Sequence, residues 1–171
     1  ILDLGGIPVL ASDRDRNAPF VIAGGPAAFN PEPVADFFDL FLLGDGEEAF
    51  PEIVEKIMLL KKAGADKRAA LRELSAVKGV YVPSLYEPEK TDRSPLVVPR
   101  PIGGAPTRIE KRVLKTFANS AFPDRIVVPG VRAVFDRVAI EAARGCPQNC
   151  RFCQASSLYF PFRVKSPNKI I

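Results

Sequence analysis

The three cysteines of the chain lie close together, within the stretch RGCPQNCRFCQA at residues 144–155. They are Cys146, Cys150 and Cys153, spaced C-x3-C-x2-C, and an aromatic residue, Phe152, directly precedes the last one. Thiolates are ligands for soft metal ions and for iron–sulfur clusters. Three thiols on one loop that also contains glycine and proline therefore indicate a metal centre rather than three unrelated core residues.

More than one kind of centre is compatible with this spacing. A structural zinc site takes four nitrogen or sulfur ligands, and this chain has three cysteines and no histidine, so zinc would need an acidic side chain or a ligand from a partner. Three thiolates can hold three irons of a 4Fe-4S cluster and leave the fourth iron open to an external ligand. A disulfide framework would leave one thiol unpaired and belongs to secreted proteins. The residues alone favour the open cluster and leave zinc as the alternative.

The elements around the cysteines must position the loop. The segment RVAIEAA at 137–143 predicts a strand that leads directly into Arg144, Gly145 and the first cysteine, and RIEKRVL at 108–114 predicts an edge strand. We therefore expect a second domain over residues 107–171, formed by the start of a β/α unit.

The first half of the chain alternates between short apolar strands, glycine turns and helices. Strands are expected at 20–23, 39–43 and 79–82, and helices at 34–37, 47–63 and 67–77. Because this order is that of a doubly wound α/β sheet, a Rossmann-like domain is expected over residues 1–83. Residues 84–106 carry prolines at 88, 95, 99, 101 and 106, which predicts a Pro-rich connector between the two domains.

Composition narrows the function classes. The chain has 171 residues, 47% of them hydrophobic, and 24 basic against 20 acidic residues give a net charge of +4. This small excess of basic residues, spread along the chain, argues against nucleic-acid binding as the main function, although RNA stays possible as a substrate. The sequence shows neither an apolar run long enough for a membrane span nor a signal peptide, so the default expectation is a cytoplasmic protein. Its opening without Met, ILDLGGIPVL, and its abrupt end suggest a fragment.

The cysteine loop resembles the signature of the radical S-adenosylmethionine (SAM) superfamily, C-x3-C-x-aromatic-C after the first strand of a partial (β/α) barrel. Most of residues 7–168 further resembles cobalamin-binding-type radical SAM proteins, in particular an uncharacterised bacterial branch. In that branch DRVAIEAARGC, RFCQA and a Tyr-x-Pro-x-Arg segment, here Tyr159, Pro161 and Arg163, recur in this order. The resemblance implies an α/β fold: a partial, cobalamin-binding-like domain followed by a truncated radical SAM barrel.

The resemblance also implies site residues and cofactors. Cys146, Cys150 and Cys153 would hold the 4Fe-4S cluster, SAM would chelate its open iron, and Phe152 would lie near the adenine. Gly24 and Gly25 match the paired glycines that let the nucleotide tail of cobalamin pass close to the backbone. The cobalt-binding Asp-x-His motif is absent, so cobalamin is possible but a scaffold domain without it is favoured.

The main hypothesis is a radical SAM enzyme that cleaves SAM to a 5′-deoxyadenosyl radical, with the present chain an incomplete and by itself inactive part. We expect an electron donor such as flavodoxin or ferredoxin and a substrate that is RNA or a small metabolite; no residue is predicted to be catalytic. One alternative is an iron–sulfur or zinc module for structure or electron transfer without SAM chemistry. The other is a nucleotide- or cobalamin-binding module with vestigial cysteines. A SAM-induced change in the spectrum of the reduced cluster and cobalamin binding to residues 1–83 would separate the three.

Overall fold

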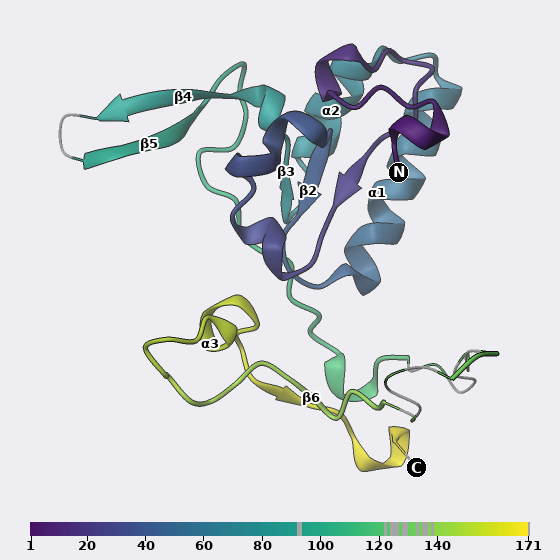
Figure 1. The fold of residues 1–171 in the computed structure, drawn as a ribbon, viewed down its shortest axis with the longest axis vertical. Coiled ribbons are helices and arrows are strands. Elements are labelled where there is room, and N and C mark those ends of the chain that lie inside the picture. The colour runs from purple at the N-terminus through teal and green to yellow at the C-terminus, as the bar shows by residue number, and fades with distance from the viewer. Residues whose placement is uncertain are drawn as a thin grey trace. The chain divides into compact units, whose positions relative to one another are not determined.

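The computed structural model describes residues 1–91, 94–121, 123, 127, 130–132, 134, 137 and 139–170 (Figure 1). The chain divides into two compact units, Ile1–Val113 and Leu114–Ile171. Each unit is mixed in secondary structure, with short strands and few helices, so the expected α/β class is confirmed at that level. In the part of the chain described, no helix has both the length and the apolar composition needed to cross a membrane.

The first unit contains a small mixed sheet in the order β1-β2-β3. β1 (Ile22–Ala23) pairs in parallel with β2 (Leu40–Leu42), and β2 pairs antiparallel with β3 (Val80–Tyr81). All three strands fall within the expected ranges, but the last pairing is antiparallel. The expected doubly wound arrangement is therefore present only in the first strand pair.

Two helices follow the sequence pattern closely. α1 (Gly46–Lys62) has Glu47 and Glu48 in its first turn and Lys61 and Lys62 in its last, charges that complement the helix dipole. α2 (Lys67–Ser75) is capped by Asp66, whose Oδ1 accepts hydrogen bonds from the backbone N–H groups of Arg68 at 2.7 Å and Ala69 at 3.2 Å.

The remaining helical turns are short 3-10 segments. The helix expected at 34–37 is one of them, η4. They are η1 (Asp3–Gly5), η2 (Ala11–Asp13), η3 (Pro26–Phe29), η4 (Glu32–Phe37), η5 (Pro83–Leu85), η6 (Phe117–Asn119) and η7 (Pro167–Lys169).

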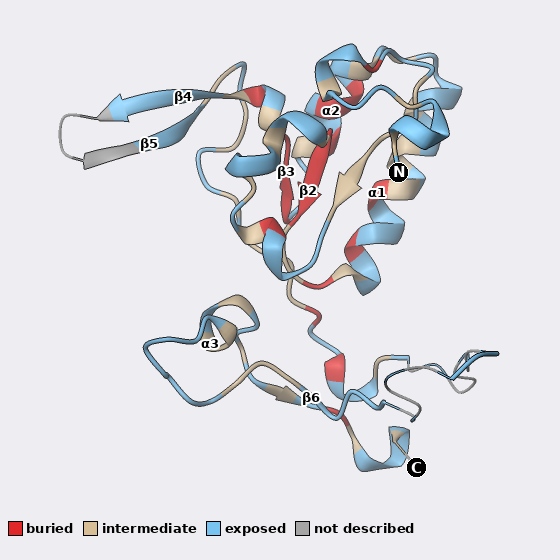
Figure 2. Ribbon diagram, in the orientation of Figure 1, coloured by how far each residue is buried: buried red, intermediate tan, exposed pale blue. Residues whose placement is uncertain are grey.

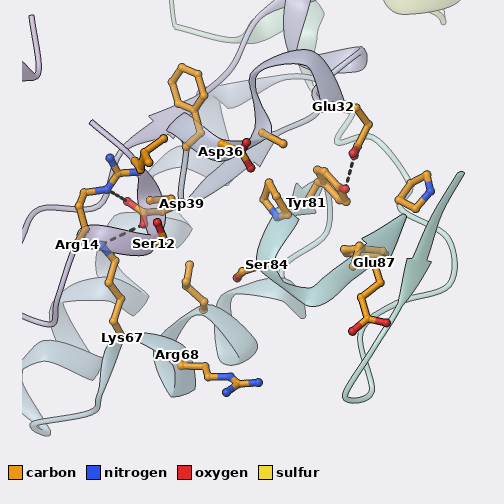
Figure 3. A pocket seen from close by; sticks show the side chains of 18 of the residues that line it. Ser12, Arg14, Glu32, Asp36, Asp39, Lys67, Arg68, Tyr81, Ser84 and Glu87 are labelled. Carbon is orange, nitrogen blue, oxygen red and sulfur yellow. Dashed lines mark hydrogen bonds and ion pairs between the residues drawn. The ribbon is translucent and has the colours of Figure 1, made fainter. Parts of the chain in front are cut away.

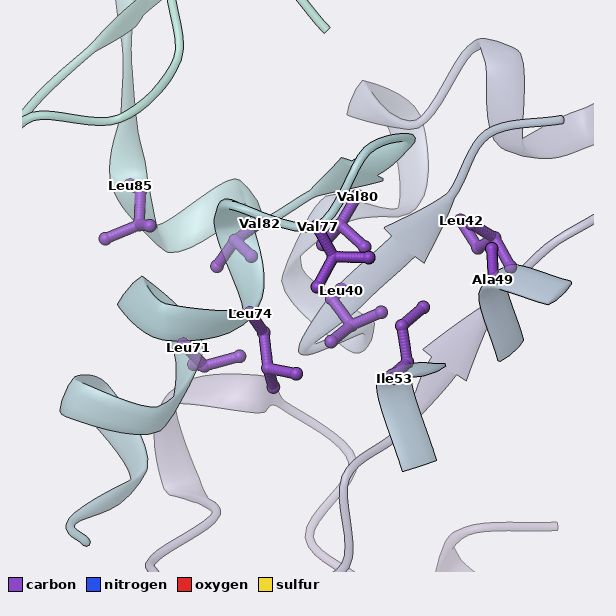
Figure 4. Close-up of a cluster of buried hydrophobic side chains, with 10 residues drawn as sticks. All are labelled: Leu40, Leu42, Ala49, Ile53, Leu71, Leu74, Val77, Val80, Val82 and Leu85. Carbon is purple, nitrogen blue, oxygen red and sulfur yellow. The ribbon is translucent and has the colours of Figure 1, made fainter. Parts of the chain in front are cut away.

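The core of the first unit lies on both faces of β2. Leu40 and Leu42 point to one face, where they pack with side chains from α1, α2 and β3, as Figure 4 shows. Phe41 points to the other face and packs with Tyr81 and Ala28, as the alternation of a strand requires. Figure 2 accordingly shows β2 and β3 as buried and β1 as intermediate. Each fully buried aliphatic side chain contributes about 1.5–3 kcal/mol, so this double-sided strand organises the unit.

Residues 84–106, the expected Pro-rich connector, contain regular structure that the sequence did not predict. Most of the segment is a β-hairpin, β4 (Tyr86–Thr91) paired antiparallel with β5 (Ser94–Pro101). Pro88 faces Pro99 in the register. In a two-stranded ribbon both strands are edges, and an edge strand tolerates a residue without an N–H. A proline-rich composition is therefore compatible with strand pairing here.

The second unit has little regular structure among its described residues. β6 (Ala143–Arg144) pairs antiparallel with β7 (Arg163–Val164), and α3 (Ala155–Leu158) lies between them in sequence. The strand expected at 137–143 is thus reduced to its end; Val138 lies outside the described residues. The strand expected at 108–114 is also absent, apart from an isolated parallel bridge between Gly44 and Arg112.

Candidate metal centre

The cysteine loop begins at a glycine that no other residue could replace without strain. Gly145 follows β6 and has φ +93°, the left-handed region. A Cβ at this position would lie 2.7 Å from the carbonyl oxygen of Tyr159 and 3.0 Å from the Cα of Phe162. The backbone at the start of the loop is therefore packed directly against residues 159–162. This segment contains the cis bond between Phe160 and Pro161.

The three thiols lie on this loop, unpaired. Cys146 is half-buried, Cys150 and Cys153 are exposed, and none forms a disulfide. The backbone N–H of Cys153 donates to the carbonyl oxygen of Cys150 at 3.1 Å. Among the described residues no group of three or more His, Cys, Asp or Glu side chains is gathered as a metal site. The structure thus places the thiols on one short loop without bringing them to a common point.

The donor chemistry of the loop still fits a thiolate-bound cluster. All three sulfurs are free of covalent partners, and two of them are accessible to reagents, which metal loading requires. Phe152 is 92% exposed, so its ring is not used for packing within this unit. An exposed ring beside the last cysteine is available to stack on a ligand.

Three cations surround one buried aromatic ring beside the loop. Phe117 of η6 is 1% exposed. The charged groups of Arg144, Arg163 and Lys165, on or directly after β6 and β7, lie 4.9, 5.4 and 5.0 Å from its ring centre. This spacing is that of a cation–π contact. The strands on both sides of the cysteine loop therefore carry positive charge.

Each cation is also held by oxygen atoms. Arg144 donates two hydrogen bonds to Glu141, both 2.8 Å long. Arg163 donates to the carbonyl oxygen of Leu114 at 3.1 Å, and Lys165 donates to Ser120 Oγ at 2.9 Å. Arg144 and Arg163 belong to the motifs described from the sequence, whereas Lys165 and Phe117 were not predicted. Only the basic residues of the FRVK segment at 162–165 could have pointed to such a cluster.

The paired glycines after β1 are explained in part by the backbone. Gly25 has φ +86° and leads into η3, and a Cβ there would meet no atom within 4 Å. At Gly24 a Cβ would lie 3.8 Å from the carbonyl oxygen of Leu42, an ordinary contact. Only Gly25 needs to be glycine for conformational reasons, and the space above it is open.

The end of β2 is covered by the chain itself. The N–H of Arg112 donates to the carbonyl oxygen of Leu43 at 2.8 Å, and the carbonyl oxygen of Arg112 accepts from the N–H of Asp45 at 2.9 Å. Gly44 (φ +101°) makes room for this crossing, because a Cβ there would lie 2.0 Å from the carbonyl oxygen of Arg112. Open α/β sheets bind ligands at the carboxyl ends of their strands. At β2 that place is filled, so the structure offers no support for cobalamin there.

Comparisons with known proteins agree with the cysteine motif. A family model described as "Radical SAM proteins, N-terminal" matches residues 1–83. A curated relative, the uncharacterized protein MJ0966 of Methanocaldococcus jannaschii, is 29% identical over 159 residues. The alignment covers 91% of this chain and 28% of the relative, so the chain spans little more than a quarter of that protein. No solved structure matches the chain. These findings support the radical SAM superfamily and do not distinguish its cobalamin-binding branch.

Proposed function

We propose that the chain is part of a radical SAM protein in which Cys146, Cys150 and Cys153 hold a 4Fe-4S cluster. The observation that carries this proposal is the coincidence of two separate signals. The family match covers residues 1–83, whereas the cysteine motif lies at 144–155, outside the matched range. Two unrelated stretches of one chain thus point to the same superfamily, which favours SAM chemistry over a zinc or electron-transfer module.

When bound, the cluster would supply an electron for reductive cleavage of SAM to a 5′-deoxyadenosyl radical, the chemistry of the superfamily. The residues of this chain would bind and orient. Gly145 fixes the start of the loop against residues 159–162. Arg144, whose charge is offset by Glu141, would hold the strand end that leads into the loop, and the positive charge of Lys165 would favour an anionic, thiolate-bound cluster. Phe152 would offer its exposed ring and backbone to the adenine.

The wider assignment belongs to the same proposal. Residues 1–83 would form a Rossmann-like, cobalamin-binding-like scaffold, and residues 107–171 the start of the barrel. The substrate would be RNA or a small metabolite, the electron donor a flavodoxin or ferredoxin, and the location the cytoplasm. Cobalamin is the least supported of these elements, because Arg112 covers the end of β2.

Anaerobic reconstitution tests the proposal. The chain should take up about four irons and four sulfides. In the reconstituted protein Cys150 and Cys153 should react much more slowly with iodoacetamide than in the protein without cluster. Addition of SAM should then change the electron paramagnetic resonance spectrum of the reduced cluster.

Two variants make the test specific. Cys150→Ala should lose most of the iron, whereas Ser156→Ala, on α3 just beyond the motif, should load like the parent. Zinc in place of iron, or a Cys150→Ala variant that holds as much cluster as the parent, would refute the assignment of ligands. A cluster whose spectrum ignores SAM would instead favour the electron-transfer module.

A further inference from the structure

A cavity of about 850 Å³ lies within the first unit, on residues that the cysteine motif does not involve. Its walls come from η2, η4, the first turn of α2, η5 and the base of the β4–β5 hairpin (Figure 3). Binding sites for small molecules have volumes of roughly 300–1,000 Å³, so the cavity has the size of a ligand site.

One wall is held by a buried ionic cluster. The side chains of Arg14, Asp39 and Lys67 are 0%, 2% and 10% exposed. Arg14 Nε donates to Asp39 Oδ2 at 3.1 Å, and Lys67 Nζ lies 3.0 Å from Asp39 Oδ1. Arg14 is further fixed by the carbonyl oxygens of Pro8 and Phe37, at 2.8 and 2.9 Å.

This cluster is fixed but not neutral. Two cations and one anion give a net charge of +1. Lys67 Nζ is buried and makes no hydrogen bond of good geometry in the described part of the chain, although the ion pair with Asp39 is close. The cluster therefore leaves one positive charge in excess on the wall beside α2, where Lys67 Nζ also lies 5.2 Å from the centre of the Phe20 ring.

Groups of opposite charge line the two sides of the cavity. Glu32 and Asp36 lie on η4, and Lys67 and Arg68 lie on the first turn of α2, as Figure 3 shows. Glu32 accepts a hydrogen bond from the hydroxyl of Tyr81. Among the described residues, the side chains of Asp36 and Arg68 have neither an ion-pair nor a hydrogen-bond partner. The cavity thus separates a carboxylate from a guanidinium, each available to a ligand.

We propose that this cavity binds a small zwitterion with a free amine and a free carboxylate, an amino acid or short peptide. The ammonium group would lie against Asp36 and the carboxylate against Arg68, over the positive wall formed by Lys67. A singly charged ligand would pair with one side only and would gain nothing from the opposite charge on the other side. Apolar surface from Phe38, Leu71 and Tyr86 would contact the body of the ligand.

Titration calorimetry of the full chain with three dipeptide probes tests the proposal. The probes are glycyl-phenylalanine, its N-acetyl derivative and its C-terminal amide. The free dipeptide should bind, and each capped form, which lacks one charge, should bind about tenfold more weakly. Absence of binding by all three probes, or equal affinity for all three, would overturn the proposal.

Two variants assign the contacts. In Asp36→Asn the acetylated dipeptide should bind as well as the free one, while the amide should still bind more weakly. Arg68→Gln should show the reverse: the amide should bind as well as the free dipeptide, and the acetylated form more weakly. Glu55→Gln on α1 and Arg72→Gln on α2, both outside the cavity, should bind like the parent. Since Asp36 and Arg68 are exposed, circular dichroism should show parent-like folding in both variants. If both cap penalties persist in a folded variant, the proposed contacts are wrong.

Discussion

The substitution Asp39→Asn should destabilise the first unit strongly, although it changes the side-chain volume hardly at all. Asp39 Oδ2 accepts hydrogen bonds from Arg14 Nε at 3.1 Å and from the backbone N–H of Val21 at 2.7 Å. Its Oδ1 lies 3.0 Å from Lys67 Nζ. Asparagine can still accept a hydrogen bond from Val21, so the charge is what the substitution removes.

The magnitude follows from the burial of the two cations. Arg14 is 0% exposed and Lys67 10% exposed at the side chain, and removing one partner from a buried ion pair costs about 3–5 kcal/mol. We expect a loss of about 3 kcal/mol in the free energy of unfolding, at the low end because asparagine keeps one acceptor. That is a large share of the 5–15 kcal/mol typical of a domain.

A second substitution separates charge from packing. Lys67→Met should cost less than about 1 kcal/mol, because it leaves Arg14 and Asp39 as a neutral pair. In the double variant Asp39→Asn/Lys67→Met, the loss should be smaller than in Asp39→Asn alone, since one of the two uncompensated cations is gone.

Urea denaturation followed by circular dichroism measures these differences. The exposed Asp36→Asn provides the matched control and should stay within about 0.5 kcal/mol of the parent. An Asp39→Asn variant as stable as this control, or a Lys67→Met variant as unstable as Asp39→Asn, would show that the charge of Asp39 does not stabilise the unit.

Three further predictions concern glycines and a tyrosine. Gly44→Ala should lower the free energy of unfolding by at least about 3 kcal/mol, because its Cβ would lie 2.0 Å from the carbonyl oxygen of Arg112 at a φ of +101°. Gly104→Ala, with φ +84° but no atom within 4 Å of its Cβ, should lower it by only about 1 kcal/mol. Equal losses for the two variants in urea denaturation would contradict the steric explanation. Gly145→Ala, whose Cβ would lie 2.7 Å from a carbonyl oxygen, should lower the iron bound per chain after reconstitution, and unchanged iron would show that the loop does not need this turn. Burial, and then the hydrogen bond to the carboxylate of Glu32, raise the pKa of Tyr81 above its ordinary 10.0. Above pH 10.0 the folded state therefore keeps a proton that the unfolded state loses, and the free energy of unfolding should fall as the pH rises. Tyr81→Phe should make this fall with pH less steep, and an unchanged slope in alkaline urea titrations would rule out Tyr81 as its source.

The regular elements of the first unit could be predicted because their signals are local. The apolar residues of α1 recur at helical spacing, and β2 is a short apolar run closed by Gly44, so both were found within one or two residues. The β4–β5 hairpin was missed because proline argues against a strand in general, whereas an edge ribbon tolerates it. The antiparallel pairing of β3 depends on tertiary packing that no local pattern encodes.

The three cysteines could be singled out for the same reason, since Cys146, Cys150 and Cys153 lie within one short stretch of sequence; that they hold a metal centre stays a prediction. The ionic cluster of the cavity could not be predicted. Arg14 and Asp39 are 25 residues apart in sequence, Lys67 lies on a different element again, and each side chain alone reads as an exposed charge. Only the fold brings them together and buries them.

The crossing of Arg112 over the end of β2 returns the last residues of the first unit to its sheet. Arg112 is held there through its backbone alone, by Leu43 on one side and Asp45 on the other. Main-chain hydrogen bonds of this kind do not depend on which side chain stands at position 112. The requirement for a particular residue falls instead on Gly44, where a Cβ would lie 2.0 Å from the carbonyl oxygen of Arg112. A missing side chain at one position thus decides whether a distant part of the sequence can reach the sheet.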